Sequence, residues 1–361
     1  MMKKICIFVA MFILTLFSVY AEDEYKVYDA KGIVLDVINE EDMNNESINT
    51  VQNVKLKILT GKYKGEIFHI KNVQSGNPVY DIPVQKGDKV IVMLEELADG
   101  NVEVNIADYV RDEYIFYLIG IFTLILLFIG KFKGLKTLIT LIITMIGIFK
   151  ILLPLMLKGY NPIILTVLIS TFITVISIFI ISGIGRKSIS AILGTISGVV
   201  IAGILAFIIG GRVKLTGLSA EEAAMLLYIP QNVKFNFQYL LFSGILLGAL
   251  GAVMDVSMSI ASSIEEINKI NRNMTVKELF LSGMNIGKDI MGTMANTLIL
   301  AYTGSSIPLI LLFMAYDTSL LKIINLDIVA TEIIRSLSGS IGLISTIPIT
   351  AITAAFLMKK N

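Results

Sequence analysis

Five polar residues lie inside two long apolar segments and carry the side chains that proton or cation transfer needs. Asp255 lies in the first segment, and the second carries Asp289, Thr293 and Asn296 at the spacing i, i+4 and i+7, which places them on one side of a helix. A carboxylate inside a membrane is costly unless it is paired, reaches water or stays protonated. The candidates for a proton-relay or transport site are Asp255, Ser259, Asp289, Thr293 and Asn296.

The two segments are consecutive, and we predict two antiparallel helices. Counted from the inner face, Asp255 is level with Gly292 and Thr293, while Asn296 lies about one turn farther out and Asp289 about one turn farther in. Contact between these helices would form one buried polar cluster. The alternative is a structural hydrogen bond between the helices, with Asp289 among the lipid headgroups.

Enzymatic chemistry is not expected, and neither is a metal or a cofactor. The only cysteine, Cys6, lies in a segment that we expect to be removed, and the only histidine, His69, lies in a predicted strand, where a lone imidazole makes no metal site. Asp255 and Asp289 differ in depth by about one turn, roughly 5 Å, which is too far for an aspartic protease pair. The sequence also has no Walker A loop.

The composition predicts that most of the 361-residue chain lies in a membrane. Hydrophobic residues make up 55% and charged residues 16%, against roughly a quarter charged in an ordinary globular protein. Lys and Arg number 30 against 29 Asp and Glu, so there is no basic field for nucleic acid. A soluble enzyme and a nucleic-acid binder are excluded. The lipid bilayer is the expected partner of a polytopic membrane protein.

Residues 1–21 have the pattern of a signal peptide. Lys3 and Lys4 precede a short apolar run, and the small residue Ala21 stands at the expected cleavage site. The apolar run is too short to cross about 30 Å of hydrocarbon comfortably. We expect cleavage after Ala21, and the alternative is a retained anchor.

Residues 22–112 hold most of the polar sequence and predict a small all-β domain. Apolar and polar residues alternate in four runs, which are separated by turns such as Ser75-Gly76-Asn77-Pro78, and the stretch from Tyr25 to Ile38 supplies a fifth strand. Five short strands predict a barrel-like domain of OB or SH3-like type, which is extracellular if the signal peptide is removed. The alternating apolar residues are Val54, Leu56 and Ile58; Phe68 and Ile70; Val90, Val92 and Leu94; and Val102, Val104 and Ile106.

Residues 113–361 predict an α-helical polytopic membrane bundle of about seven spans. The sixth span is too long and is expected to break at Gly304-Ser305-Ser306 and Pro308; as a hairpin it would make eight spans. With seven spans, the cytoplasmic ends carry ten Lys and Arg residues against six outside. This balance favours the bacterial cytoplasmic membrane with the carboxyl terminus inside. The predicted spans are 114–130, 135–157, 161–183, 188–210, 239–264, 284–316 and 338–358.

Small residues recur at every fourth position in three of these spans, which lets helix backbones approach closely. The rows predict a compact bundle rather than separate anchors. Such rows serve packing within a chain or between chains, so they leave a homo-oligomer open. The expected packing residues are Gly194, Gly198 and Ala202; Gly244, Gly248 and Ala252; and Gly342.

Three runs of sequence resemble the YibE/F family of bacterial membrane proteins: GALGAVMDVSMSIASSIEEI at 248–267, GKDIMGTMANTLILAYTG at 287–304 and GKYKGEIFHIKNVQSGNPVYD at 61–81. This resemblance implies an architecture and no activity. A weaker one joins the residues from Gly251 to Asp255, and the helix containing Thr293, to the SecD/SecF and RND-type permeases. It implies a proton-relay role for Asp255, although the large external RND domain and a second adjacent acid are missing here.

Two functions follow as hypotheses. The leading one is a transporter-like bundle in which the cluster around Asp255 binds a proton or a small cation and couples it to an unknown substrate. The alternative is a non-transporting scaffold or sensor whose β domain binds an envelope ligand or partner. The substitution Asp255→Asn separates them, because Asn preserves a structural hydrogen bond but cannot carry a proton.

Overall fold

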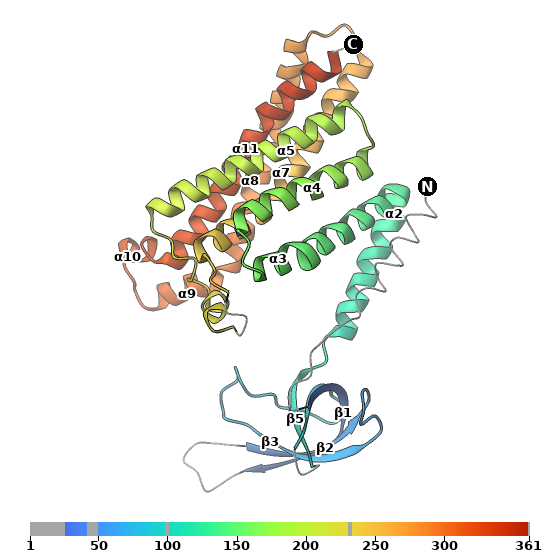
Figure 1. Cartoon of the computed structure of the whole chain (residues 1–361), viewed down its shortest axis with the longest axis vertical. Helices are drawn as coiled ribbons and strands as arrows, with labels where there is room; N and C mark the ends of the chain where they lie inside the picture. The colour runs from blue at the N-terminus through green and yellow to red at the C-terminus, as the bar shows by residue number, and fades with distance from the viewer. Residues whose placement is uncertain (1–25, 42–49, 98–100, 230–232, 360–361) are drawn as a thin grey trace. The chain divides into compact units, whose positions relative to one another are not determined.

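The computed structural model describes residues 26–41, 50–97, 101–229 and 233–359, in two compact units (Figure 1). The first unit ends at Phe122 and the second begins at Thr123. The predicted signal peptide lies outside the described residues.

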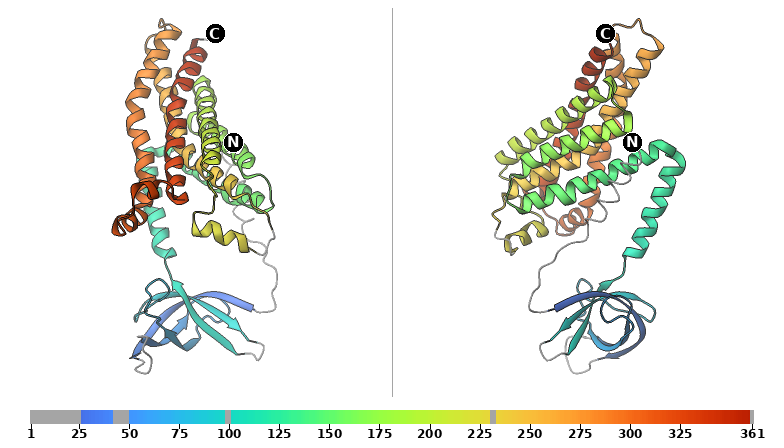
Figure 2. Two further views of the ribbon diagram at one scale, coloured as in Figure 1. Left: turned by 90° about the vertical axis from the view of Figure 1, so that its left-hand side faces the viewer. Right: turned by 45° about the vertical axis from the view of Figure 1, so that its right-hand side comes forward.

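Five antiparallel strands form a single sheet in the order β3-β2-β1-β4-β5. β1 has 16 residues and pairs with β2 and with β4, so the sheet curls around it into a half-barrel (Figure 2). The predicted small β domain is confirmed, but β3 and β5 do not pair, so the barrel is open. The strands are β1 Lys26–Glu41, β2 Thr50–Ile58, β3 Ile67–Val73, β4 Lys89–Glu96 and β5 Val102–Tyr109.

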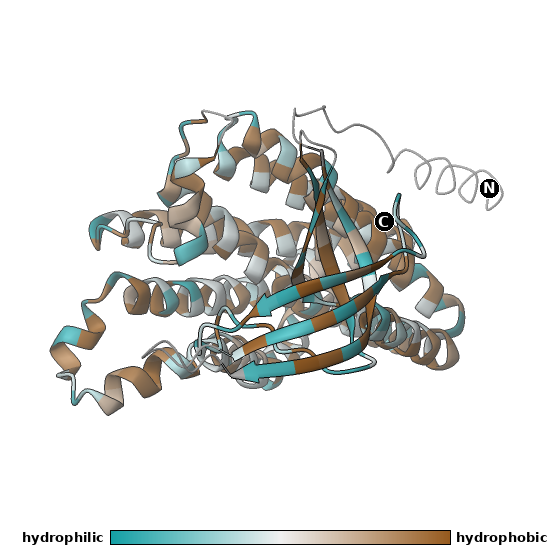
Figure 3. Cartoon of the chain, turned by 90° about the horizontal axis from the view of Figure 1, so that it is seen from below, coloured by the Kyte–Doolittle hydropathy of each residue, from teal (hydrophilic) through white to brown (hydrophobic). Residues whose placement is uncertain are grey.

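Period-2 alternation builds the core of this sheet, as Figure 3 shows in the changing hydropathy along each strand. Leu56 of β2 and Val90 and Val92 of β4 are fully buried. A buried amide also supports the core, because Gln52 accepts a hydrogen bond from the Val84 N–H at 2.9 Å and donates one to the Val84 carbonyl at 3.1 Å. The sheet therefore has a hydrophobic core of its own.

The second unit consists of long apolar helices, which confirms the predicted membrane bundle. Five segments are long and apolar enough to cross a membrane, and the bent pair α8 and α9 makes a sixth if it is one span. The helices are α2 Asp112–Ile146, α3 Leu153–Leu157, α4 Pro162–Ser182, α5 Arg186–Arg212, α6 Glu221–Met225, α7 Phe237–Ile270, α8 Val276–Ser305, α9 Ile307–Ala315, α10 Leu320–Ile324 and α11 Asp327–Lys359, with a π-helix at Gly147–Leu152 and a 3-10 turn at Leu226–Tyr228.

The first apolar segment contains two of the predicted spans. It covers Asp112–Leu157, 46 residues, and a helix of that length is about twice as long as the hydrocarbon is thick. The helix is broken at Lys131, whose φ of 47° and ψ of −125° are not helical. After the break, Gly134 passes so close to the Leu126 carbonyl that a Cβ atom would collide with it. The spans predicted at 114–130 and 135–157 lie on the two sides of this break.

Two helices begin earlier than the hydropathy pattern predicts. α8 starts at Val276 rather than 284, because Thr275 and Glu278 form a capping box in which the Glu278 N–H donates to the Thr275 hydroxyl at 3.2 Å. α11 starts at Asp327 rather than 338, so Arg335 lies in a helix and not in a loop. The predicted break between α8 and α9 is present, as a bend of 59°.

The most extensive contact between described helices joins α5 and α11, which also pack against α7. A Cβ atom added to Gly342 would lie 2.6 Å from the Gly198 carbonyl oxygen and 2.7 Å from the Ala202 Cβ. The buried Thr346 hydroxyl donates a hydrogen bond to the Gly194 carbonyl at 3.1 Å. The small residues of α5 and α11 therefore face each other in the bundle core.

Candidate functional site: the polar face of α7 and α8

The outer face of α7 has no large apolar side chain from Phe237 to Lys269. Before its charged end, the only exposed residues of this helix are Gly244, Gly248, Gly251 and Asp255. Their spacing places them on one side of the helix. Asp255 is therefore the one charged group on a surface made otherwise of glycine.

The neighbouring helix α8 also exposes polar residues. Asp289, Thr293 and Asn296 are all exposed, and so is Gly292. We call the exposed residues Gly244, Gly248, Gly251, Asp255, Asp289, Gly292, Thr293 and Asn296 the α7–α8 polar face.

Contacts between α7 and α8 fix the relative depth of these residues. Cβ atoms added to two glycines of α8 would meet α7 side chains, with Gly283 at 2.6 Å from the Ile264 Cδ1 and Gly287 at 3.4 Å from the Ile260 Cδ1. Toward the other end, a Cβ on Gly248 would lie 2.5 Å from the Tyr302 hydroxyl. This antiparallel register puts Asp255 at the depth of Gly292 and Thr293.

Asp255 and Thr293 share a depth, with Asp289 and Asn296 about one turn to either side, but these residues do not form one buried cluster. Among the described residues, no hydrogen bond or ion pair joins Asp255 to Asp289, Thr293 or Asn296, and the Thr293 hydroxyl donates to the Ile290 carbonyl of its own helix at 2.9 Å. The buried side of α7 is filled by apolar residues such as Val253, which pack toward α5 and α11. The carboxylate is consequently left on the outer side.

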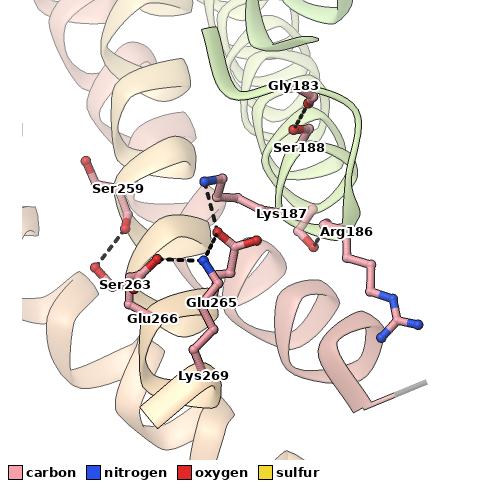
Figure 4. A network of polar contacts seen from close by, with 10 residues as sticks. Gly183, Arg186, Lys187, Ser188, Ser259, Ser263, Glu265, Glu266 and Lys269 are labelled. Atoms are coloured by element: carbon pink, nitrogen blue, oxygen red, sulfur yellow. Dashed lines mark hydrogen bonds and ion pairs between the residues drawn. The ribbon is translucent and has the colours of Figure 1, made fainter. Parts of the chain in front are cut away.

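Ser259 lies half-buried, one turn after Asp255 and close to a charged network at the end of α7 (Figure 4). Its carbonyl accepts a hydrogen bond from the Ser263 hydroxyl at 2.9 Å. Glu265 then pairs with Lys187 of α5 at 2.9 Å and with Lys269 at 3.3 Å. The network ties α5 to α7, a link that the sequence does not reveal because 78 residues separate Lys187 from Glu265.

The third small-residue row has a different environment from the rows of α5 and α11. In this row of Gly244, Gly248 and Ala252, a Cβ atom on Gly244 would meet nothing within 4 Å, whereas one on Gly248 would lie close to Tyr302. Ala252 is partly buried against the bundle core. Only part of this row therefore packs against the bundle, and the neighbouring Gly251, outside the row, also faces open space.

A further polar group joins α11 to α8. Its members, Glu332, Arg335 and Tyr302, are not among the candidate residues predicted from the sequence. Glu332 and Arg335 pair at 3.0 Å, and the Arg335 guanidinium carbon lies 5.9 Å from the centre of the Tyr302 ring. The i, i+3 spacing of Glu332 and Arg335 is a helix signal that precedes the apolar part of the last span.

The α7–α8 polar face offers carboxylate, hydroxyl and amide oxygens. Oxygen atoms of these types are the ligands that hard cations prefer. Within the described ranges, no group of three or more His, Cys, Asp or Glu side chains is arranged to hold a metal ion.

Comparison with known proteins identifies both parts of the chain. Residues 118–360 match the family described as YibE/F-like protein, and residues 24–109 match the YibE/F family N-terminal domain. No curated protein and no solved structure matches the chain. The resemblance to SecD/SecF and RND-type permeases stays a prediction. Because the two matches cover nearly the whole sequence, the chain belongs to the YibE/F family.

Proposed function

We propose that this protein is a membrane transporter in which the α7–α8 polar face binds and releases a proton or a small cation, coupled to the movement of a substrate. The observation that carries this proposal is the position of Asp255 on an outer helix face made otherwise of glycine. The outer faces of other spans are covered by large apolar residues, such as Leu168 and Phe172 on α4 and Ile204 on α5. Those faces suit lipid, whereas the α7 face does not.

A carboxylate that faced lipid would cost about 2.5–3.5 kcal/mol or more at the middle of a bilayer. Water beside the α7–α8 polar face removes that cost and gives Asp255 a route for proton exchange. Thr293 lies at the same depth and supplies a hydroxyl oxygen. In this proposal the β domain lies outside the bacterial cytoplasmic membrane and the carboxyl terminus lies in the cytoplasm, as the Lys and Arg balance predicts.

The test is proton flux through the purified protein in liposomes under an imposed pH gradient. We expect flux in the wild type and a reduction of at least tenfold in Asp255→Asn, because the amide cannot bind and release a proton. The matched control is Asp317→Asn. Asp317 lies outside the apolar spans and has a φ of 45°, a conformation that Asn adopts readily.

Two results would contradict proton transfer through Asp255. One is equal flux above background in the wild type and Asp255→Asn. The other is background flux in both proteins, even when candidate substrates are supplied on either side. A loss of flux in Asp317→Asn as well would point to damaged reconstitution and would require the measurement to be repeated with matched protein incorporation.

A second candidate function is a scaffold or sensor, and one observation in the β domain favours it. Val79 and Tyr80 are each 78% exposed in the loop between β3 and β4. Asp81 fixes this loop by accepting hydrogen bonds from the Ser75 N–H at 2.6 Å and the Ser75 hydroxyl at 2.8 Å. An exposed apolar pair on a fixed loop suits a binding surface. A photo-crosslinker at position 80 should then capture a partner in cells, and one at exposed Lys57 should not.

A further inference from the structure

A cavity of about 270 Å³ lies where the end of α8, the bent helix α9 and the start of α11 come together. Six of its eleven lining residues are aliphatic, among them Ile299, Leu309 and Ile333. Its volume corresponds to about nine water molecules in the liquid, so one bridging water does not fill it. The space suits a group with a mainly apolar body.

One wall of this cavity carries a carboxylate in which only one of the two oxygen atoms has a partner. Glu332 lines the cavity and pairs with Arg335 through its Oε1 atom at 3.0 Å. Its Oε2 atom is shielded from solvent and has no hydrogen-bond partner. An ionised carboxylate oxygen only accepts hydrogen bonds, so the missing partner must be a donor. The Nε atom of Arg335 is also shielded and has no hydrogen-bond partner. A head that carries only acceptors, such as a carboxylate or a fully ionised phosphate, would satisfy Arg335 Nε but leave Oε2 of Glu332 without a donor.

The location of the cavity favours an amphiphile. Glu332 lies six residues before the predicted span 338–358, about 9 Å along the helix axis, near the expected boundary between headgroups and hydrocarbon. The lining residues Ile310 and Leu337 are 41% and 50% exposed, so the cavity opens at an apolar surface. α9 has nine residues and is too short to cross a bilayer alone.

We propose that this cavity binds an amphiphile with an apolar body and a protonated primary amine. The amine donates a hydrogen bond to Oε2 of Glu332, and the body lies against the aliphatic wall. An aminophospholipid headgroup and a soluble alkylamine share this chemistry. The cavity adjoins the α7–α8 polar face through Tyr302, which lines the cavity and lies beside Gly248, but shares none of the residues that define that face. The inference therefore goes beyond the proposed transport function and does not depend on it.

The experiment measures ligand-induced shifts in the thermal unfolding of the full-length protein in detergent. The probes are a short-chain phosphatidylethanolamine, phosphatidylcholine with the same chains, octylamine and octyltrimethylammonium. We expect the primary amines to raise the melting temperature and the methylated amines to leave it unchanged, because methylation removes every N–H donor. A shift with phosphatidylethanolamine alone identifies a lipid headgroup, and one with octylamine alone identifies a soluble amine.

Three variants locate the binding site. Ser336→Leu narrows the cavity by two heavy atoms while leaving the Glu332–Arg335 pair in place, and it should reduce the shift. Glu332→Gln keeps the cavity volume but removes the charge, and it should weaken binding roughly tenfold. Ser282→Leu makes the same change at a half-buried position of α8 outside the cavity, and it should bind like the wild type.

Other outcomes overturn the proposal. Equal shifts with methylated and primary amines would show that no donor is required. A shift of undiminished size in Ser336→Leu would place the ligand elsewhere. If no probe shifts the melting temperature, the cavity holds only water. If Ser336→Leu does not fold, wild-type affinity in Glu332→Gln would by itself contradict the proposed contact.

Discussion

The α5–α11 interface and the outer face of α7 are both rich in small residues, yet only the first is a packing interface. At Gly198 and Gly342 the two backbones are so close that a Cβ atom on Gly342 would lie 2.6 Å from the opposite carbonyl oxygen. At Gly244 and Gly251 a Cβ atom would meet open space. Similar rows of glycine therefore have different roles in two neighbouring helices.

The difference teaches that the opposite surface decides what a glycine row does. The row of α5 faces Thr346 and Thr350 of α11, whose short side chains allow close approach. The exposed glycines of α7, which are Gly244, Gly248 and Gly251, lie on the outer side of the helix and precede Asp255 on that side. Small residues are required in the first case by contact between backbones. In the second, they leave the Asp255 side chain accessible.

The largest expected effect comes from adding one methyl group to each row. Gly198→Ala places a Cβ atom 2.8 Å from the Val253 Cγ1 and 2.9 Å from the Gly342 carbonyl oxygen, so we expect a loss of about 1–3 kcal/mol in the free energy of unfolding. Gly251→Ala meets no atom and should be neutral or stabilise by up to about 1 kcal/mol, since Ala favours helix. Reversible unfolding of the purified protein in detergent measures both.

The proposed difference between the α5 and α7 glycines is contradicted if Gly251→Ala destabilises the protein as much as Gly198→Ala does. Such a result would mean that another surface covers the outer face of α7 in the functional protein. Measuring the molecular mass of the protein in the same samples would then show whether that surface belongs to a second copy of this chain.

A smaller effect is expected from removing one hydroxyl group at the α5–α11 interface and one on the α7–α8 polar face. Thr346→Val eliminates the buried hydrogen bond to the Gly194 carbonyl and should cost about 1 kcal/mol. Thr293→Val makes the same change on the exposed α7–α8 polar face and should stay within about 0.5 kcal/mol. Equal losses in the same unfolding assay would show that Thr293 has a partner.

The smallest effect concerns an aspartate that, unlike Asp255, has hydrogen-bond donors. The Ser75 amide, with the Ser75 hydroxyl, holds the pKa of Asp81 below its ordinary value. A lowered pKa means that this stabilisation is complete above the unfolded-state pKa and is lost as the pH falls through the folded-state pKa.

Asp81→Asn should therefore destabilise the β domain slightly at pH 7 and less at pH 3, because the stabilisation is lost as the pH falls through the lowered folded-state pKa. Thermal unfolding of the full chain at the two pH values, followed by a probe on the sheet, measures this difference. An equal difference at both pH values would contradict the role of the charge. Asp255 makes no side-chain hydrogen bond to the part of the chain that the structure describes, so Asp255→Asn should change unfolding little at pH 7.

The fold was largely predictable because its signals are periodic and local. Alternation at Val90, Val92 and Leu94 predicted β4, and the hydropathy of α4 and α5 set their ends within about two residues. The misplaced starts of α8 and α11 have a local cause as well. The apolar stretch of the sequence is interrupted by charged residues such as Glu278 and Glu332, whereas the helix continues through them.

The candidate site was only partly predictable. The depth of Asp255 relative to Thr293 follows from helix geometry, and the contacts of Gly283, Gly287 and Gly248 agree with it. Whether Asp255 faces the core depends on how α7 is rotated. That rotation is set by long-range packing of α7 against α5 and α11, which no local pattern encodes.

The sequence by itself determined that this chain has a small β domain followed by long apolar helices, because strand and helix periods and overall hydropathy are properties of consecutive residues. The tertiary structure alone decided which faces meet. It buried the glycine row of α5 against α11, left Asp255 on the outer side of α7, and brought Tyr302 beside the Glu332–Arg335 pair. The physical reason is that helix rotation and crossing minimise the free energy of the whole bundle, in which each contact joins residues far apart in the chain.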